Sequence, residues 1–328
     1  MKSTVGLVAL LFLVAPAAIR AGSAIESAAA DKATFKTGID LVALSVTVTN
    51  RAEKHVLGLR ADDFVVLEDG VRQSVSFFSA TNVPLDLAIL LDASASMHGK
   101  MSLARDAAVA LAKSLRPGDR ASVVEFRDAV RVRQPLTPDI GAVEATLGEI
   151  VPGGSTSMYD ALYIALKELA GAVRGPEAVR RQAIVLLSDG ADTASLISAE
   201  DVLDLARREG VAVYAISLRA PAEIAREKLA NGGRRFFGEG DYGLKRIAQD
   251  TGGRAFFPQE PDELRAIFGS VAEELGHQYA IGYVPSNDRR DGTWRRVAVQ
   301  VLSGDAQPRT RTGYFANTDS PAPQRTMN

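Results

Sequence analysis

The sequence predicts an α/β protein with a doubly wound, mostly parallel sheet that carries helices on both faces, together with a small antiparallel β domain. Between residues 84 and 276, continuous apolar runs alternate with amphipathic stretches, as strands buried on both faces do with the helices that cover them. Residues 38–82 and 278–315 instead alternate apolar and polar side chains with a period of two. Neither flanking segment could bury its apolar face alone, so we expect the two to combine into one β-sandwich-like domain around the inserted α/β block.

The first 24 residues have the layout of a secretory signal peptide. Lys2 supplies the positive charge, residues 5–15 are apolar, and small residues continue to Ala24, with candidate cleavage positions after Ala21 and Ala24. The apolar run is shorter than the roughly 20 residues that span a bilayer, and the chain has no cysteine to accept a lipid. The sequence therefore predicts an exported protein, periplasmic or secreted, without a stable membrane span after cleavage. An uncleaved N-terminal anchor is the alternative.

The flanking segments carry strand and turn signals. Strands are expected at 42–49, 64–68, 71–78, 278–284, 294–301 and 309–315. Asp69-Gly70 predicts a hairpin turn, because both central positions of the favoured two-residue turn need positive φ. The tail, 316–328, has no pattern and is expected to be disordered. Four arginines are expected to line a solvated strand edge: Arg289, Arg290, Arg295 and Arg296.

The central block predicts alternating strands and helices. Strands are expected at 85–91, 121–126, 183–187 and 211–217. Helices are expected at 100–116, 159–173, 199–209 and 262–275. The last helix is the clearest, because Leu264, Phe268, Val271 and Leu275 fall on one face. Strand and helix in alternation indicate a parallel sheet covered on both sides.

The composition excludes several classes of function. Lys and Arg number 38 against 40 Asp and Glu, so the formal net charge is −2 and nothing indicates a nucleic acid as partner. Cysteine is absent, which removes disulfide frameworks and thiolate metal sites. The three histidines, His55, His98 and His277, leave most zinc sites and Ser/His/Asp triads short of residues.

Hydroxyl and carboxylate side chains follow two of the expected parallel strands. Asp92, Ser94 and Ser96 come directly after one strand, and Asp189 comes after another. A glycine-rich loop between them ends in Thr156. Because ligands bind where the carboxyl ends of parallel strands meet, we expect these side chains to lie together. Three hydroxyls and two carboxylates suit a small, hard cation that takes oxygen ligands.

These five positions, in this order and at these strand ends, resemble the metal-ion-dependent adhesion site (MIDAS) of von Willebrand factor A domains. The flanks resemble a bacterial subgroup, the VWFA-related domain family. The matching segments are 59–70, 251–257, 277–283 and 291–294. The resemblance covers most of residues 38–315, and it implies a Rossmann-like sheet and a metal-dependent binding module.

The resemblance also implies a role for each residue of the site. Ser94 and Ser96 would contact the metal directly, and Thr156 would do so directly or through water. Asp92 and Asp189 would act mostly through bridging water. Mg²⁺, or Mn²⁺, is the implied metal, because Mg²⁺ prefers oxygen ligands and keeps several waters. A Glu or Asp of a partner protein would fill the position left open.

Three further features accompany the site. Ser155 stands where related loops often have glycine, which we expect to stiffen the loop without removing the hydroxyl ligand. Asp160 and Asp192 are candidates to support the ligands from behind, or to serve as ordinary helix-start and loop acids. In related adhesion domains the final helix slides to couple ligand binding to shape; here that helix would be 262–275, which the flanking β segments could equally lock.

Other interpretations remain open at this point. Ser96 could simply cap the following helix, and Asp189-Gly190 could be an ordinary turn. The protein would then be a metal-independent extracytoplasmic scaffold with a relic site. A metal-dependent hydrolase that uses Asp92 as nucleophile or base is a third possibility, but no His, Lys or Glu pairs with Asp92 by sequence, and no nucleophile elbow or phosphatase Asp-x-Asp is present. The sequence therefore favours a binding module and not an enzyme.

Overall fold

The computed structural model describes residues 41–80, 83–172, 180–189, 192–218, 229, 239–258, 263–302 and 304–318. The expected signal peptide, 1–24, and the end of the expected tail, 319–328, lie outside this part of the chain. Among the residues described, no helix has the length and apolar character needed to cross a bilayer.

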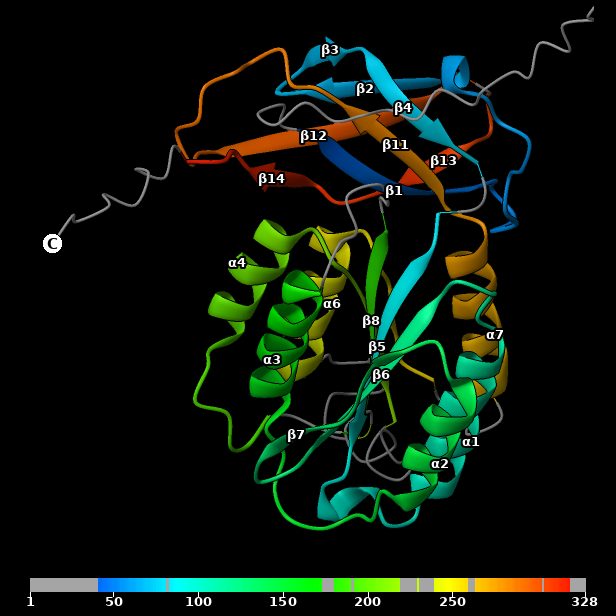
Figure 1. The fold of residues 1–328 in the computed structure, drawn as a ribbon, viewed down its shortest axis with the longest axis vertical. Helices are drawn as coiled ribbons and strands as arrows, with labels where there is room; N and C mark the ends of the chain where they lie inside the picture. Colours follow the sequence, from blue (N-terminus) through cyan, green and yellow to red (C-terminus); the bar gives the residue numbers. More distant parts are fainter. Residues whose placement is uncertain are drawn as a thin grey trace, which may run out of the picture. The chain divides into compact units, whose positions relative to one another are not determined.

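A six-stranded sheet forms the centre of the α/β block (Figure 1). Its order is β10-β9-β8-β5-β6-β7, and all neighbours are parallel except β6 and β7, which are antiparallel. The strands are β5 (Leu85–Asp92), β6 (Arg120–Phe126), β7 (Val130–Thr137), β8 (Arg181–Ser188), β9 (Ala212–Ser217) and β10 (Ala255–Phe256). The chain moves from β5 to β6 on one side and later to β8 on the other, so the strand order reverses at β5.

Helices cover both faces of this sheet (Figure 1). One face carries α1 (Met101–Lys113), α2 (Ile140–Glu149) and α7 (Glu263–Gly276). The other face carries α3 (Met158–Gly171), α4 (Ala199–Glu209) and α6 (Glu239–Thr251). Every residue of β5 is buried, with Leu87 and Ile89 packing on the first face and Ala88 and Leu90 on the second. This explains the unbroken apolar run that predicts the strand.

The predicted fold class is confirmed, but four elements carry too weak a sequence signal to be predicted. β7 is an edge strand that contains Pro135 and alternates arginines with apolar residues, so it lacks the run typical of a buried strand. α2 is short, and its N-cap is Asp139, whose side chain accepts a hydrogen bond from the N–H of Ala142. α6 and the two-residue β10 complete the set.

The flanking segments form two four-stranded antiparallel sheets that share one apolar core. The first has the order β13-β1-β11-β4 and the second β14-β12-β2-β3. Their strands are β1 (Val42–Thr49), β2 (Phe64–Glu68), β3 (Val71–Gln73), β4 (Val75–Ser79), β11 (Tyr279–Tyr283), β12 (Trp294–Val301), β13 (Gln307–Arg309) and β14 (Gly313–Phe315). A short 3-10 helix, η1 (Ala61–Asp63), precedes β2. Each sheet contains strands from both ends of the chain.

Several expectations for these segments need correction. The strand expected at 71–78 is two strands, because the chain leaves one sheet after Gln73 and enters the other at Val75. The strand expected at 309–315 is likewise divided between β13 and β14. Residues 316–318, expected to begin a disordered tail, are paired: the N–H of Ala316 donates to the carbonyl of Thr293, and Thr318 bridges to Asp291.

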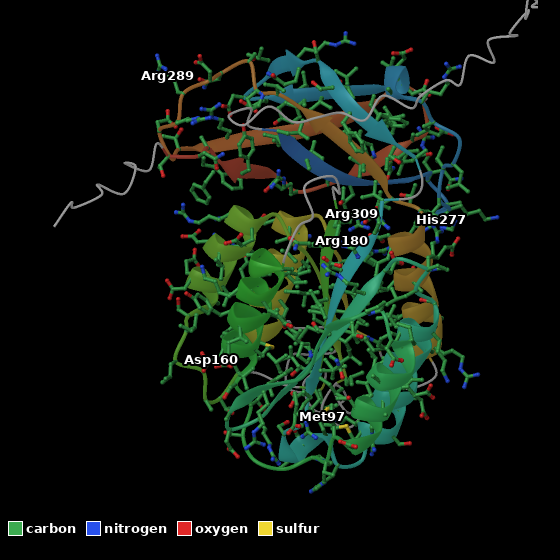
Figure 2. All side chains as sticks on the ribbon, viewed as in Figure 1. Met97, Asp160, Arg180, His277, Arg289 and Arg309 are labelled. Carbon is green, nitrogen blue, oxygen red and sulfur yellow. The ribbon has the colours of Figure 1, made fainter. Side chains whose placement is uncertain are left out.

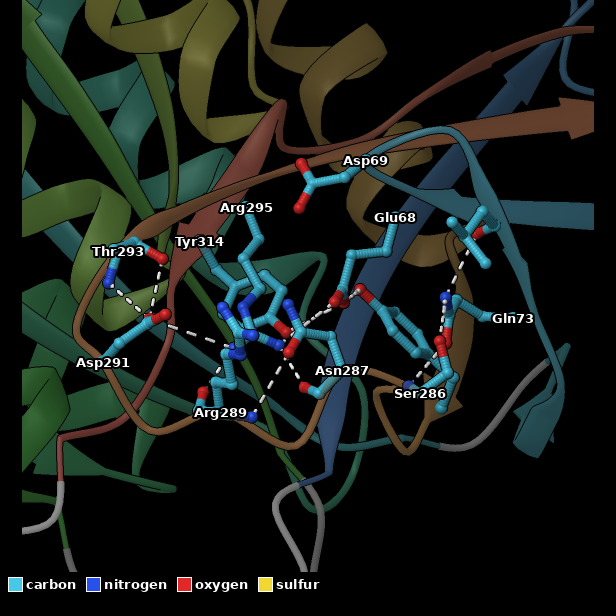
Figure 3. Close-up of polar contacts among 12 residues, drawn as sticks. Glu68, Asp69, Gln73, Ser286, Asn287, Arg289, Asp291, Thr293, Arg295 and Tyr314 are labelled. Carbon is cyan, nitrogen blue, oxygen red and sulfur yellow. Dashed lines mark hydrogen bonds and ion pairs between the residues drawn. The ribbon is translucent and has the colours of Figure 1, made fainter.

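Arg295, expected on a solvated edge, is instead only 2% exposed. Its guanidinium lies 3.3 Å from Glu68 and also donates to the carbonyls of Asn287 and Arg289 (Figure 3). The alternating pattern of β12 places Arg295 on the inner face of the sheet. There its charge is paired with the buried carboxylate of Glu68 and is not, as expected, solvated by water.

A buried carboxylate also joins the end of α7 to its surroundings. Glu274 Oε1 accepts hydrogen bonds from Tyr214 on β9 at 2.5 Å and from Thr47 on β1 at 3.1 Å, and lies 2.5 Å from the guanidinium of Arg309 on β13. The carbonyl of Leu275 accepts a hydrogen bond from Arg181 at 2.6 Å. These contacts attach the C-terminal end of α7 to both the parallel sheet and the antiparallel strands.

Candidate metal centre

The candidate centre begins at the carboxyl end of β5, beside the point where the strand order reverses. Asp92 is fully buried. Its Oδ1 accepts the N–H of Ser94 at 2.8 Å, and its Oδ2 accepts the hydroxyl of Ser188 at 2.6 Å. Ser188 is the last residue of β8, so the hydrogen bond links the ends of two neighbouring parallel strands.

A chain of hydroxyls continues from this aspartate across the strand ends. Ser94 and Ser96 share a hydrogen bond of 2.9 Å between their Oγ atoms, and the Ser96 hydroxyl donates to Asp189 Oδ1 at 2.7 Å. Ser96 lies in a short 3-10 helix, η2 (Ala95–Met97), and Asp189 directly follows β8. Four of the five predicted residues thus lie in one hydrogen-bonded group, as the parallel sheet predicts.

Lys100 adds a positive charge that the sequence analysis missed. Its Nζ lies 2.5 Å from Asp189 Oδ2, and the side chains of Lys100 and Asp189 are 20% and 2% exposed. The signal for this contact was its position four residues after Ser96, at the start of α1. Ser188 was also missed as a partner of the site, although it adjoins Asp189 in the sequence.

The glycine-rich loop is held against the loop after β5 by its backbone. The N–H of Gly153 donates to the carbonyl of Ala93 at 2.7 Å, and the carbonyl of Gly154 accepts from the N–H of Ala95 at 3.0 Å. Gly154 has φ +87°, and a Cβ there would collide with the carboxylate of Asp128. Only glycine therefore fits this position without strain.

Ser155, the departure from the family pattern, has a defined partner. Its N–H and its hydroxyl donate to Asp128 Oδ1 at 2.8 and 2.7 Å. These two hydrogen bonds hold the pKa of Asp128 below its usual value. The serine thus attaches the glycine-rich loop to the turn after β6.

Thr156, the fifth predicted residue, is 6% exposed and lies between this loop and residues 192–197. Its N–H donates to the hydroxyl of Thr193 at 3.0 Å, and its carbonyl accepts the N–H groups of Thr193 and Ala194 at 2.9 and 3.0 Å. The backbone of Thr156 is therefore fixed beside the loop that carries Ser94, through Gly153 and Gly154.

Asp160 and Asp192 support this arrangement through backbone groups. Asp192 accepts the N–H of Met158 at 2.7 Å, at the first turn of α3. Asp160, labelled in Figure 2, accepts the N–H groups of Leu196 and Ile197 at 3.1 and 3.0 Å. In the part of the chain described, neither carboxylate forms a hydrogen bond or ion pair with the side chains of the five site residues. Both residues fasten loop 192–197 to α3, next to Thr156.

The electrostatic environment separates Asp92 from the other buried carboxylates. Burial raises the pKa of Asp92, hydrogen bonds from Ser188 and Ser94 offset only part of that rise, and the negative charge of Asp189 adds to it. Within the described ranges, no lysine or arginine forms an ion pair with Asp92. Four other buried carboxylates each face at least one arginine, which is Arg120 and Arg180 for Asp86, Arg295 for Glu68, Arg127 and Arg133 for Glu125, and Arg309 for Glu274. Asp119 instead accepts the backbone N–H groups of Leu85 and Arg116.

The side chains present fit a hard divalent cation. All the donors are oxygens, three from hydroxyls and two from carboxylates, and a buried carboxylate without a basic partner favours a cation nearby. The described residues contain no group of three or more His, Cys, Asp or Glu arranged to hold a metal, and three of the five donors at this centre are hydroxyls. Ser94, Ser96 and Thr156 would supply neutral ligands, and Asp92 and Asp189 the negative charge.

The chain is similar to a known protein family. The family model for the von Willebrand factor type A domain matches residues 86–269. A UPF0353 protein of Mycolicibacterium paratuberculosis is 26% identical over 246 residues, which cover 69% of this chain and 70% of the relative. A UPF0353 protein of Mycobacterium leprae is 27% identical over 229 residues, which cover 66% of each. The chain thus spans about two thirds of the length of these relatives.

Two solved structures match this chain with the same TM-score. A von Willebrand factor type A protein from Catenulispora acidiphila is 15% identical with a TM-score of 0.46, and the match covers 87% of this chain and 76% of that one. Proximal thread matrix protein 1 from the mussel byssus, in a structure with a zinc-occupied MIDAS motif, is 20% identical with a TM-score of 0.46. That match covers 63% of this chain and 49% of the mussel protein.

Proposed function

This chain belongs to the von Willebrand factor type A family, and from that premise we propose that it is an exported, metal-dependent binding module. In this proposal a divalent cation, Mg²⁺ or Mn²⁺, is held at the carboxyl ends of β5 and β8, and an acidic side chain of a partner protein completes its coordination. The protein is not an enzyme in this proposal, because its residues position a cation and leave the partner unchanged.

The observation that carries the proposal is the buried carboxylate of Asp92, which forms no ion pair with a described lysine or arginine. An unpaired carboxylate in a protein interior is costly, and Asp86, Glu68 and Glu274 have arginine partners. Asp92 instead bonds to hydroxyl and N–H groups and lies behind two further serine hydroxyls. A cation beside Ser94 and Ser96 would supply the missing positive charge.

Each residue has a separate task in this mechanism. Asp92 fixes the loop through the N–H of Ser94 and contributes charge from behind. Ser96 connects that loop to Asp189, so the hydroxyl ligands and the second carboxylate keep a constant spacing. Neutral hydroxyl ligands leave much of the cation's charge available, and the bound cation supplies a coordination position for the partner's carboxylate. The backbone contacts of Gly153 and Gly154 keep Thr156 in place.

Calorimetric titration of Mg²⁺ and Mn²⁺ into metal-stripped protein tests the metal site. We expect one saturable site in the wild type, and loss of that site in Ser94→Ala and Ser96→Ala. Ser102→Ala is the matched control, because Ser102 is exposed on α1 and leaves the five site residues intact. Folded protein that binds neither ion would refute the proposal and favour the metal-independent scaffold.

The partner's chemistry needs its own test. Mg²⁺-loaded protein used as bait should retain proteins through an acidic residue, and retention should be lost with EDTA and in Ser96→Ala. Substituting the acidic residue of a captured partner by its amide should also abolish binding. Capture that is insensitive to EDTA would contradict a metal-bridged contact.

Export rests on residues 1–24 and is tested by mass spectrometry of the mature N-terminus. We expect it to begin after Ala21 or Ala24 in protein recovered from outside the cytoplasm. A retained leader would contradict this part of the proposal and leave the metal site untouched.

A hydrolase is the less favoured candidate. The carboxylate of Asp92 accepts hydrogen bonds from Ser188 and Ser94. In the described part of the chain, no histidine or lysine lies within hydrogen-bond distance of it, as a partner in acid–base catalysis would. Metal-dependent turnover of simple phosphoesters or esters, lost in Ser94→Ala, would reverse this preference.

A further inference from the structure

The ammonium group of Lys100 lies inside the group of residues proposed to bind the metal. Its Nζ is 2.5 Å from Asp189 Oδ2, while Oδ1 of the same carboxylate accepts the Ser96 hydroxyl. The backbone of Lys100 is fixed as well: its N–H donates to the carbonyl of Met97 and its carbonyl accepts the N–H of Ala104, both at 2.9 Å. The lysine is therefore a cation held in place by the chain itself.

We propose that Lys100 is the resident cation of the metal-free centre and lowers its affinity for divalent cations by competing for Asp189. This inference rests on the proposed function, since it concerns the regulation of the same site. It makes Lys100 a residue that sets metal affinity, a role opposite to that of the five predicted ligands.

Two physical effects make the lysine a competitor. A divalent cation, or a water bound to it, needs an oxygen of Asp189, and both oxygens already have partners. A fixed positive charge a few ångströms from the cation also repels it, more strongly in a buried site than in water. Binding of the metal therefore has to displace or weaken the contact between Lys100 and Asp189.

The same contact stabilises the metal-free protein. Without Lys100, Asp189 would be a second buried carboxylate without a positive partner, beside Asp92. The two negative charges would then repel each other. Linkage then requires a reciprocal effect: a change that weakens the metal-free state but leaves the metal-bound state intact must tighten metal binding. The centre stays folded without metal, and responds only when the cation is concentrated enough to displace the lysine.

The test compares three variants of the full-length mature protein. Lys100→Met keeps the length and apolar stem of the side chain but removes its charge. Lys100→Arg keeps the charge. Lys113→Met is the matched control, because Lys113 is an exposed lysine on α1 that pairs with Glu144. For each protein, Mn²⁺ affinity is measured by electron paramagnetic resonance and calorimetry, and the unfolding midpoint is measured with and without metal.

We expect Lys100→Met to bind Mn²⁺ at least tenfold more tightly than the wild type, to melt at a lower temperature when metal-free, and to gain more from added Mn²⁺. Lys100→Arg should stay within about threefold of the wild type, and Lys113→Met should not differ from it. Both readouts must change together, because competition links the metal-free state to the affinity.

Each other outcome has a distinct meaning. Wild-type binding with no tightening in Lys100→Met would overturn the competition and leave the proposed function standing. Loss of binding in Lys100→Met would show that the lysine positions Asp189 for the metal, which also overturns it. Binding that appears only in Lys100→Met would support the competition but overturn the proposed function, because the wild-type site would then take no cation. Absence of binding in both proteins would refute this inference and the proposed function together.

Discussion

Two buried aspartates lie at the two ends of the same strand, and their environments are opposite. Asp86 stands at the start of β5 and Asp92 at its end, about 20 Å apart along an extended strand. Asp86 receives hydrogen bonds from Arg120 at 2.7 and 2.8 Å and from Arg180 at 2.8 Å. Figure 2 shows Arg180 and Met97, the neighbour of Ser96, at opposite ends of the sheet.

The pKa values of the two carboxyls move in opposite directions. Burial raises the pKa of Asp86, but hydrogen bonds from Arg120 and Arg180 and their charges outweigh it, so the pKa is lowered overall. Burial also raises the pKa of Asp92, and hydroxyl and N–H groups do not overcome it. The difference teaches that burial does not define a functional carboxylate in this protein. The kind of partner does, because an arginine completes the charge balance and a hydroxyl leaves it open.

Asp86→Asn should have the largest effect on stability. The amide leaves Arg120 and Arg180 facing each other with no negative charge between them, and removing one partner of a buried ion pair costs about 3–5 kcal/mol of unfolding free energy. Urea denaturation of metal-free protein measures this loss. Asp106→Asn, on the exposed side of α1, should stay within about 0.5 kcal/mol of the wild type.

Asp86→Asn should also leave the Mn²⁺ affinity of the folded protein within about twofold of the wild type, because distant sites act independently. A large loss of affinity in this variant would break the comparison, since it would show that the two ends of β5 are coupled.

Gly154→Ala should have the next largest effect, at the site end of the sheet. The left-handed backbone and the collision with Asp128 together predict a loss of about 1–3 kcal/mol and weaker metal binding. Gly148→Ala is the control: Gly148 lies in α2 with open space around its Cβ position, so alanine should stabilise the protein by about 0.4–1 kcal/mol. Equal effects at both glycines would contradict the strained conformation assigned to Gly154.

Asp92→Asn should stabilise the metal-free protein and abolish metal binding. The amide removes the cost of a buried charge while its oxygen still accepts the N–H of Ser94, so we expect a gain of about 1 kcal/mol, or about 2–4 °C in melting temperature. Differential scanning calorimetry measures this gain. A destabilised variant would mean that the charge of Asp92 is compensated in the folded protein, and the contrast with Asp86 would fail.

The smallest predicted effect is the acid dependence of the Asp86 contribution. Its pKa in the folded protein is below the ordinary value of 3.8, so its stabilisation is present above that pH and is lost as the pH falls through the lowered value. The deficit of Asp86→Asn relative to the wild type should therefore shrink below pH 4, by about 1 kcal/mol for each pH unit of titration. Denaturation of both proteins at pH 5 and pH 3 measures the change, and a deficit that grows in acid would reverse the assigned sign.

The sequence predicts the strand ends well because parallel topology alone brings them together. Asp92, Ser94, Ser96 and Asp189 follow two unmistakable buried strands, so their meeting requires no knowledge of side-chain conformations. The contact of Lys100 with Asp189 is different, since it depends on where a long, flexible side chain points. The hydrogen bond from the Ser188 hydroxyl to Asp92 likewise depends on the register between β5 and β8. The pattern of apolar residues in the two strands does not specify that register.

The flanking strands show a related limit. Alternation with a period of two predicts that residues 71–78 form strand, but it carries no signal for the change of sheet between Gln73 and Val75. The buried arginine of β12 was missed for a similar reason: a charged residue in an alternating strand is expected to face water unless its partner, here Glu68, is known.

The antiparallel sheets impose an order on folding. β1 pairs with β11 and β13, and β2 pairs with β12. The N-terminal strands therefore cannot form these pairs until residues more than 200 positions later in the chain have been synthesised. Closing so long a loop adds little to the equilibrium cost, because each doubling of loop length costs only about 0.6 kcal/mol. It slows the search, since distant pairings form late. Until residue 279 and those beyond it have been synthesised, β1 and β2 present unpaired edges, and a chain that ends earlier keeps them permanently open to aggregation.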